Sequence, residues 1–204
     1  MSDSRTKSNA ERGHPQVRAL RGLGEAAIGR LRGVGPAPSW NPPDCGDIDM
    51  RIAADGTWFY CGSPIERLPL VQMFAAVLRK ETDRFVLVTP VEKVGIKVDD
   101  APFLAVEMRI EEQANERRLI FRTNVEDLVT VDSEHQLRFE RGAGDGLKPY
   151  VKVRDDLWAL IKRAVSYDLM ALGQNERIGN QDWFGVRSCG VFFPMCPAME
   201  VEGL

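Results

Sequence analysis

The apolar and polar positions of the chain follow two different periods. Residues 47–53 (DIDMRIA) alternate, residues 57–62 (TWFYCG) are rich in β-forming types, and the ADG between them supplies a glycine for a tight turn. This pattern predicts a β-hairpin. Residues 63–81 then contain the apolar spacing of a helix that ends near Thr82, and Pro69 lies where a first-turn proline is tolerated. The apolar stripe of this helix comprises Leu70, Met73, Phe74, Val77 and Leu78.

Further along the chain, strand-like runs follow one another and a second helical pattern closes the series. A glycine-rich link, RGAGDG, separates the last two strands. We expect a helix over residues 155–173, with Asp155 or Asp156 as its N-cap, Gly173 as its stop, and a stripe formed by Leu157, Leu160, Ile161, Ala164 and Val165. The expected strands cover residues 85–90, 92–101, 103–112, 119–124, 128–140 and 149–154.

The two helical patterns and the strands before them suggest an internal duplication. A shift of 87 positions places Met50-Arg51-Ile52 on Leu137-Arg138-Phe139, Arg67 on Arg154, and one helix stripe on the other. A second echo joins TPVEKVGIKVD, which starts at Thr89, to TNVEDLVTVD, which starts at Thr123. We interpret the chain as a strand–strand–helix unit that occurs twice by common ancestry, and we expect the seam between the copies to be concave.

The predicted fold class is therefore α+β, with two related small domains built mostly from antiparallel sheets. The expected boundaries are a mobile N-terminal arm over residues 1–35, a first domain over 36–117, a second domain over 118–173, and a C-terminal tail over 174–204 that packs on the body.

Composition and charge narrow the classes of partner and cofactor. The net charge is −3, but residues 1–40 carry seven Lys or Arg against three Asp or Glu, so the remainder carries −7. An acidic body disfavours a nucleic-acid polymer as partner. No apolar run reaches the ~20 residues of a membrane-spanning helix, and the polar start lacks the apolar stretch of a secretory signal, so we expect a cytoplasmic protein. The four cysteines form no C-x-x-C pair, and we expect neither a metal nor another cofactor.

Several phrases of this sequence, taken in order, resemble a known bacterial family. They are GDIDMRIAADGTWFYCGSPIERLPLVQMFAAVLRKE, FVLVTPVEKVGIKVDDAPFLAVEM, FRTNVEDLV, LKPYVKVRDDLWALIKRAVSYDLM and VRSCGVFFP. The family is domain of unknown function 1285, and the resemblance runs from about residue 36 to residue 194. It implies a duplicated core, a second domain superficially like a pleckstrin-homology fold, and a cleft between domains that holds a nucleotide-like ligand in signalling. It implies no catalytic residues.

The candidate ligand contacts are mostly cations in the repeated positions. A guanidinium group suits phosphate because two parallel N–H donors meet two oxygens, although each arginine could equally pair with a nearby acid. Hydroxyls at strand ends could hold phosphate oxygens or simply be β-formers, a histidine could donate a proton or lie in a turn, and Trp58, Tyr60 and Tyr150 could stack on a base or fill the core. The candidate residues are Arg51, Arg67, Thr89, Lys93, Arg122, Thr123, His135, Arg138 and Arg154.

Three functions are compatible with these observations. The first is a non-enzymatic ligand-binding or signalling module that binds an anionic, nucleotide-like molecule between the two domains. The second is a protein-interaction module that uses the pleckstrin-like half and its sheet edge. The third is an enzyme with an unrecognised site, in which His135 is the first residue to examine. The sequence contains no G-x-S-x-G, no G-x-x-x-x-G-K-[ST] and no Rossmann glycine fingerprint, so it matches none of the common catalytic templates.

Overall fold

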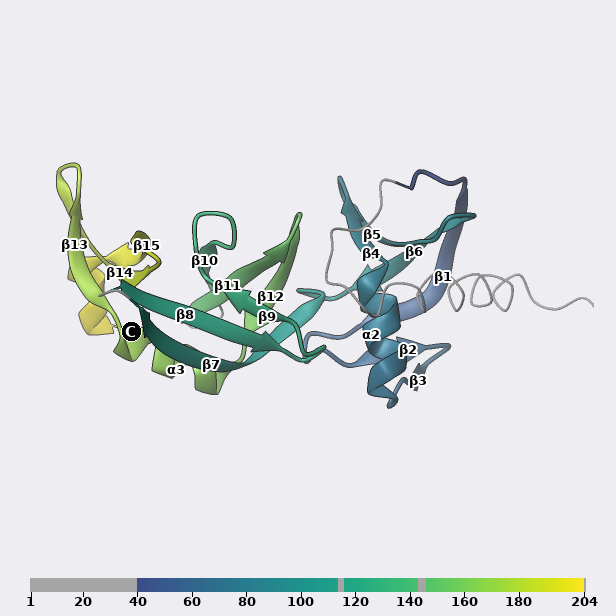
Figure 1. The fold of residues 1–204 in the computed structure, drawn as a ribbon, viewed down its shortest axis with the longest axis horizontal. Helices are drawn as coiled ribbons and strands as arrows, with labels where there is room; N and C mark the ends of the chain where they lie inside the picture. Colours follow the sequence, from purple (N-terminus) through teal and green to yellow (C-terminus); the bar gives the residue numbers. More distant parts are fainter. Residues whose placement is uncertain (1–39, 114–115, 143–145, 204) are drawn as a thin grey trace, which may run out of the picture.

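The computed structural model describes residues 40–113, 116–142 and 146–203. The predicted N-terminal arm lies outside these residues. The described chain contains three β-sheets, which follow one another along the longest axis of the molecule (Figure 1). No helix in the described residues is long and apolar enough to cross a membrane.

The first sheet has six strands in the order β3-β2-β1-β6-β5-β4. All neighbours pair antiparallel except β1 and β6, which are parallel. The expected hairpin is confirmed, since the Asp55-Gly56 turn joins β1 to β2. The elements are β1 (Asp44–Ile52), β2 (Trp58–Tyr60), β3 (Ser63–Pro64), α2 (Leu68–Ala76), β4 (Leu78–Glu81), β5 (Arg84–Val88) and β6 (Lys93–Val98).

The second sheet also has six strands, in the order β10-β11-β12-β7-β8-β9. Here β12 and β7 are the parallel pair, and the other neighbours are antiparallel. Helix α3 follows the last strand and contacts β7 (Figure 1). The elements are β7 (Phe103–Gln113), β8 (Glu116–Thr123), β9 (Leu128–Thr130), β10 (Leu137–Arg141), β11 (Leu147–Arg154), β12 (Leu157–Ile161) and α3 (Arg163–Ala171).

The two sheets have the same topology, so the predicted duplication of the core is confirmed. Each consists of two three-stranded meanders, joined where the first strand of the unit lies parallel to the last. Strand β1 therefore corresponds to β7, and β6 corresponds to β12. The helix occupies different places, because α2 joins the two meanders of the first unit whereas α3 follows the second unit.

The predicted register of the repeat is wrong. A shift of 87 positions places Leu70 and Phe74 of helix α2 on Leu157 and Ile161, which belong to strand β12. Burial in β12 alternates from residue to residue, as expected for a strand that pairs on both sides. The apolar residues of LWALI fit the period of a helix as well as that of a strand. The segment forms a strand because it pairs with β7 and β11.

Both predicted helices are too long, because part of each predicted range forms a strand. Helix α2 ends at Ala76, because Leu78–Glu81 pair with β5 as strand β4. Helix α3 begins at Arg163 after Lys162 as N-cap, so neither Asp155 nor Asp156 caps it. Pro69 lies in the first turn of α2, as predicted.

The boundaries of the units also differ from the expected ones. Strand β7 belongs to the second sheet, so the expected boundary between residues 117 and 118 lies inside that sheet. The segment that joins the sheets is residues 99–102, between β6 and β7. The C-terminal segment forms a third sheet from β13 (Gln174–Ile178), β14 (Gln181–Ser188) and β15 (Val191–Pro197), followed by the 3-10 helix η2 (Ala198–Gly203).

A buried serine connects the third sheet to the second. The Ser188 hydroxyl on β14 accepts a hydrogen bond from the Leu119 amide (3.0 Å) and donates one to the Val131 carbonyl (2.7 Å). Ser188 is fully buried. The serine thus gives two backbone groups of the second unit the partners that buried polar groups require.

The seam between the first two units is part of a continuous apolar core. Trp58 and Phe74 of the first unit stack with ring centroids 6.1 Å apart, and they belong to the same buried cluster as Phe103 and Leu157 of the second unit. The two expected domains therefore share one core. Aspartates of the joining segment contact both sides, since Asp99 pairs with Arg51 of β1 whereas Asp100 pairs with Lys148 of β11.

Candidate functional site

The nine residues predicted as ligand contacts do not meet in one hollow. Arg51 and Lys93 lie in the first sheet, and Arg67 is the exposed N-cap of α2. Arg122, Thr123 and Arg154 lie around the turn between β8 and β9, where Arg154 pairs with Asp127. The others are Thr89 in the turn after β5, His135 in the turn before β10, and Arg138 on β10.

Most of these cations already have a carboxylate partner. Arg51 lies 2.6 Å from Asp99, and its guanidinium carbon lies 4.8 Å from the centroid of the Phe59 ring. Arg122 pairs with Glu107 (2.7 Å) and with Glu126 (2.8 Å). Arg51 and Arg122 therefore pair with nearby acids, which is the alternative to ligand binding. An incoming anion would have to compete with these carboxylates.

Lys93 forms the least exposed of the ion pairs in the first sheet. Its ammonium group lies 2.9 Å from Glu81, and the two side chains are 13% and 27% exposed. The hydrogen bond from Lys93 lowers the pKa of Glu81; burial opposes this effect, and Arg79 adds to it. A lowered pKa in the folded state means that Glu81 stabilises the fold above its unfolded pKa and loses this contribution as the pH falls through the folded pKa.

We predict that Glu81→Gln lowers the free energy of unfolding by about 1 kcal/mol at about pH 6 and by less at an acidic pH below the folded-state pKa of Glu81. The difference between the variants shrinks on acidification because both proteins then carry an uncharged side chain at this position. Urea unfolding of the two proteins at both pH values measures it. A difference that stayed constant with pH would show that Glu81 acts by packing and not by its charge.

Thr89 and Thr123 have their hydroxyls engaged in hairpin turns. Thr89 Oγ1 accepts hydrogen bonds from the amides of Val91 (3.3 Å) and Glu92 (3.1 Å). Thr123 Oγ1 accepts them from the amides of Val125 (3.3 Å) and Asp127 (3.1 Å). Both threonines are almost fully buried. The similarity between the segments that start at Thr89 and Thr123 therefore reflects the same kind of turn. In each, the threonine hydroxyl accepts hydrogen bonds from backbone amides of the turn.

His135 lies in a comparable turn between β9 and β10. Asp132 Oδ1 accepts hydrogen bonds from the amides of Glu134 (2.9 Å) and His135 (2.8 Å), and it lies 3.2 Å from His135 Nδ1. These hydrogen bonds lower the pKa of Asp132 against the effect of its burial, which is the largest single influence. The geometry is that of an aspartate-nucleated turn.

Arg154 is the predicted arginine that does face the seam. Its guanidinium donates to the Ala75 carbonyl at the end of α2 (2.5 Å), lies 3.4 Å from Asp127 Oδ2, and covers the Phe103 ring at 5.2 Å. Gln72 of α2 also crosses the seam and donates to the Val125 carbonyl (3.1 Å). Arg154 therefore joins the two units, and two of its guanidinium nitrogens donate within the protein.

Burial opposes the charge on both members of this pair. It raises the pKa of Asp127, and the nearby Arg154 only partly offsets that effect. Burial likewise lowers the pKa of Arg154 against the attraction of Asp127. The pair is thus costly to desolvate, and each charge depends on the other for compensation.

Arg138 has a different environment, on the outer face of the second sheet. Its guanidinium carbon lies 4.5 Å from the centroid of the Trp158 ring and 4.8 Å from that of Tyr150, within the range of cation–π attraction. Glu140 Oε1 lies 3.1 Å from Arg138 Nε. Arg138 remains exposed, so the stacking orients its guanidinium without removing it from solvent.

Groups at the border of the seam hold the two rings in place. The Tyr150 hydroxyl donates to Asp100 in the joining segment (2.8 Å), and burial together with this hydrogen bond raises the pKa of Tyr150. Trp158 Nε1 donates to Asp156 (3.2 Å), which also pairs with Lys80 of the first unit (3.0 Å). Both rings are therefore connected to the seam through an aspartate.

Lys152 adds a second cation to this face. Side chains alternate along β11, so Lys152 lies on the same face as Tyr150, and it is the cross-strand neighbour of Trp158. Within the described part of the chain Lys152 makes no ion pair. We call Arg138, Tyr150, Lys152 and Trp158 the arginine platform.

The sequence indicated only part of the platform. Arg138 was expected from the repeat. Tyr150 and Trp58 were considered as stacking residues, and both are buried, Tyr150 beneath Arg138 and Trp58 in the core. Trp158 was placed on a helix, and Lys152 was not considered. The alternation in KPYVKVRDDLWALI is the signal that places both on the outer face.

The fold and the arrangement of these side chains define an α+β protein with a duplicated six-stranded core and a cationic, aromatic surface beside the seam. The chain belongs to the DUF1285 family. Residues 35–101 match "Domain of unknown function (DUF1285), N-terminal domain", and residues 102–195 match "Protein of unknown function (DUF1285), C-terminal domain". The two matches meet in the joining segment, and the resemblance seen in the sequence is confirmed.

Solved structures of the family resemble this chain to different degrees. The crystal structure of a DUF1285 family protein from Silicibacter pomeroyi DSS-3 is 47% identical, covers 88% of this chain and 97% of its own, and has a TM-score of 0.78. A DUF1285 family protein from Shewanella baltica OS155 is 27% identical, covers 59% of this chain and 89% of its own, and has a TM-score of 0.48. No curated protein matches this chain.

Proposed function

We propose that this protein is a non-enzymatic binding module that takes an anionic, nucleotide-like ligand on the arginine platform. The observation that carries the proposal is the position of Arg138, stacked over Tyr150 and Trp158 yet exposed to solvent. The ligand class is the one that the family resemblance implies. The proposed position differs from the expected one. Arg154 and the shared core fill the interior of the seam, so we place the site at the border of the seam.

The chemistry of the platform suits both parts of a nucleotide. A guanidinium that is stacked on one side offers its other plane to a base and its N–H edge to phosphate oxygens. Lys152 supplies an ammonium group beside Trp158 that can approach the same phosphate. The contacts with Tyr150 and Trp158 reduce the entropy that Arg138 loses on binding.

The platform supports binding and not turnover. Its ionisable groups are two cations and a tyrosine whose hydroxyl donates to Asp100 and whose pKa is raised. A tyrosine in this state is a poor general base at neutral pH. Binding without chemistry is the behaviour of a sensor, which agrees with the signalling role expected from the family. His135, the first residue to examine for an enzyme, lies in a turn with Asp132.

We predict that Arg138→Ala weakens nucleotide binding about 10- to 100-fold, the effect of losing charge-assisted hydrogen bonds. The measurement is the shift of melting temperature of the full chain against a panel of nucleoside mono-, di- and triphosphates and cyclic nucleotides. Arg67→Ala is the matched control, because Arg67 is an exposed arginine at the far end of α2. A panel that leaves the wild type unshifted, or that shifts Arg138→Ala equally, would refute the proposal.

A protein-interaction module is the second candidate. Strand β9 is an edge strand of the second sheet, and its Leu128 is 59% exposed. An apolar residue on an open edge favours pairing with an added strand of a partner. The expected likeness of the second unit to a pleckstrin-homology fold stays a prediction. An unshifted nucleotide panel would favour this candidate.

A further inference from the structure

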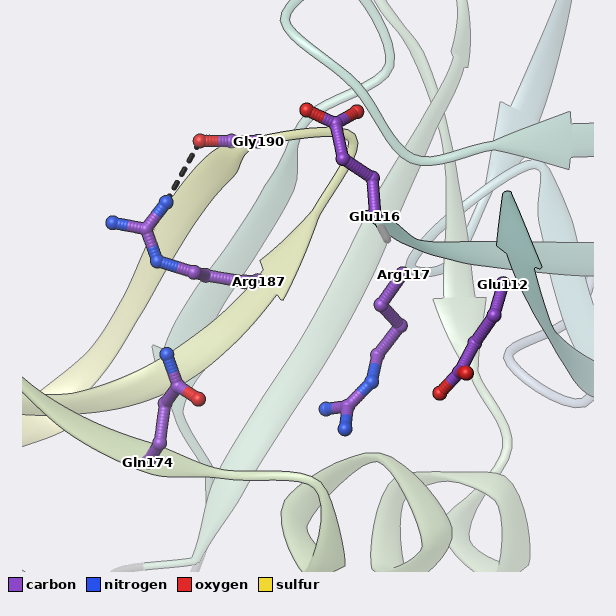
Figure 2. A pocket seen from close by; sticks show the side chains of 6 residues that line it. All are labelled: Glu112, Glu116, Arg117, Gln174, Arg187 and Gly190. Carbon is purple, nitrogen blue, oxygen red and sulfur yellow. Dashed lines mark hydrogen bonds between the residues drawn. The ribbon is translucent and has the colours of Figure 1, made fainter. Parts of the chain in front are cut away.

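A second candidate site lies away from the platform, between the β7–β8 hairpin and the third sheet. It is an open pocket of about 450 Å³, which is within the range of small-ligand sites. Figure 2 shows side chains from both sheets around it. Its lining residues are Glu112, Glu116, Arg117, Gln174, Arg187 and Gly190.

One of the two arginines in the pocket is already neutralised. Arg187 makes two hydrogen bonds to Glu176 (2.6 and 2.8 Å) and a third to the Gly190 carbonyl (2.8 Å), the last of which is drawn in Figure 2. This arrangement satisfies the fork of the guanidinium with a bidentate carboxylate. Arg187 therefore forms a wall of the pocket and is not available as a free cation.

The other charged groups of the pocket have no such partner. Arg117, Glu112 and Glu116 make no ion pair within the part of the chain that the structure describes. Arg117 is the cross-strand neighbour of Glu112, and the two side chains extend in the same direction in Figure 2, whereas Glu116 extends toward Gly190. The pocket thus presents one unpaired cation and two unpaired anions at separate places.

This distribution of charge selects the class of ligand. A polyphosphate would meet two carboxylates and only one free guanidinium, so repulsion disfavours it. A basic α-amino acid carries the complementary set, which is one carboxylate and two ammonium or guanidinium groups. We propose that the pocket binds a basic α-amino acid, with its carboxylate on Arg117, its α-ammonium group on Glu112 and its side-chain cation on Glu116.

Gln174 completes the proposed contacts. It lines the pocket, and Figure 2 shows its side chain on the same side as Arg187. An amide can donate to the ligand carboxylate while its oxygen accepts from the α-ammonium group. Because Glu112 and Glu116 are exposed, the pairs formed are partly screened by water, and we expect weak affinity that falls with ionic strength.

The test is calorimetric titration of the full chain with L-lysine at low ionic strength. Two analogues each remove one charged group: L-norleucine lacks the side-chain ammonium, and 1,5-diaminopentane lacks the carboxylate. We expect each analogue to bind at least about tenfold more weakly than L-lysine. No binding of L-lysine, or equal binding of L-lysine and 1,5-diaminopentane, would overturn the proposal.

Variants assign the contacts to residues. Arg117→Met and Glu116→Gln are each expected to weaken L-lysine binding about tenfold or more, and circular dichroism reports whether each variant folds. The matched control is Arg109→Met, since Arg109 is an exposed arginine of the same hairpin. Unchanged affinity in a folded Arg117→Met or Glu116→Gln variant would overturn the assignment. Arg138→Ala should leave L-lysine binding intact, so this site and the platform are tested independently.

Discussion

Replacing Arg154 by methionine is expected to lower the free energy of unfolding by about 3 kcal/mol. The change leaves Asp127 charged and without its partner, and it removes the donor to the Ala75 carbonyl. The side chains of Arg154 and Asp127 are 20% and 26% exposed, which places the loss at the lower end of the range for buried pairs. We therefore expect this replacement to lower the free energy of unfolding more than the replacement of an exposed arginine does.

Denaturant unfolding at neutral pH measures this loss, and Arg67→Met is the control. Arg67 is exposed at the other end of α2, so its replacement should change the free energy by less than about 0.5 kcal/mol. The double variant Arg154→Met, Asp127→Asn should regain part of the loss, because no unpaired charge remains. Equal losses at Arg154 and Arg67 would argue that the seam does not depend on this pair.

Replacing Trp58 by alanine is expected to cost about 3–5 kcal/mol. Trp58 is 1% exposed and stacks with Phe74, so truncation removes a large buried side chain and leaves a cavity beside the seam. Trp58 Nε1 has no hydrogen-bond partner among the described residues. Trp58→Phe keeps an aromatic ring and also removes this unsatisfied donor, so its cost should be only about 1 kcal/mol.

Chemical denaturation of both Trp58 variants separates cavity formation from the polar effect. A Trp58→Phe variant as unstable as Trp58→Ala would mean that the indole N–H has a partner such as bound water, and that its loss dominates. A small loss in Trp58→Ala would instead indicate that the core can collapse around the missing ring.

Local patterns predicted the first part of the fold well. The alternation before Gly56 and the position of Pro69 correctly placed the β1–β2 hairpin and the start of α2. The residues after Val77 and those of LWALI have apolar spacings that suit either a helix or a strand, and their pairing partners lie in distant segments. A parallel pair such as β12 and β7 leaves no local signal of its register.

The same limit applies to the candidate sites. The sequence shows which residues are cations, but it does not show which acids lie beside them in space. The partner of Arg51 is 48 residues away, and the rings under Arg138 come from two further strands. The residues that line the pocket near Arg117 come from two sheets, so no contiguous sequence motif predicts the pocket.

Asp99 and Asp100 are neighbours in the chain, yet they bind opposite units. Asp99 pairs with Arg51, whereas Asp100 pairs with Lys148 and accepts a hydrogen bond from Tyr150. Any hinge motion about this short connection must break at least one of these contacts. Inserting one residue between the two aspartates would separate these two contacts, and the shared core and Arg154 would then be left to hold the units together.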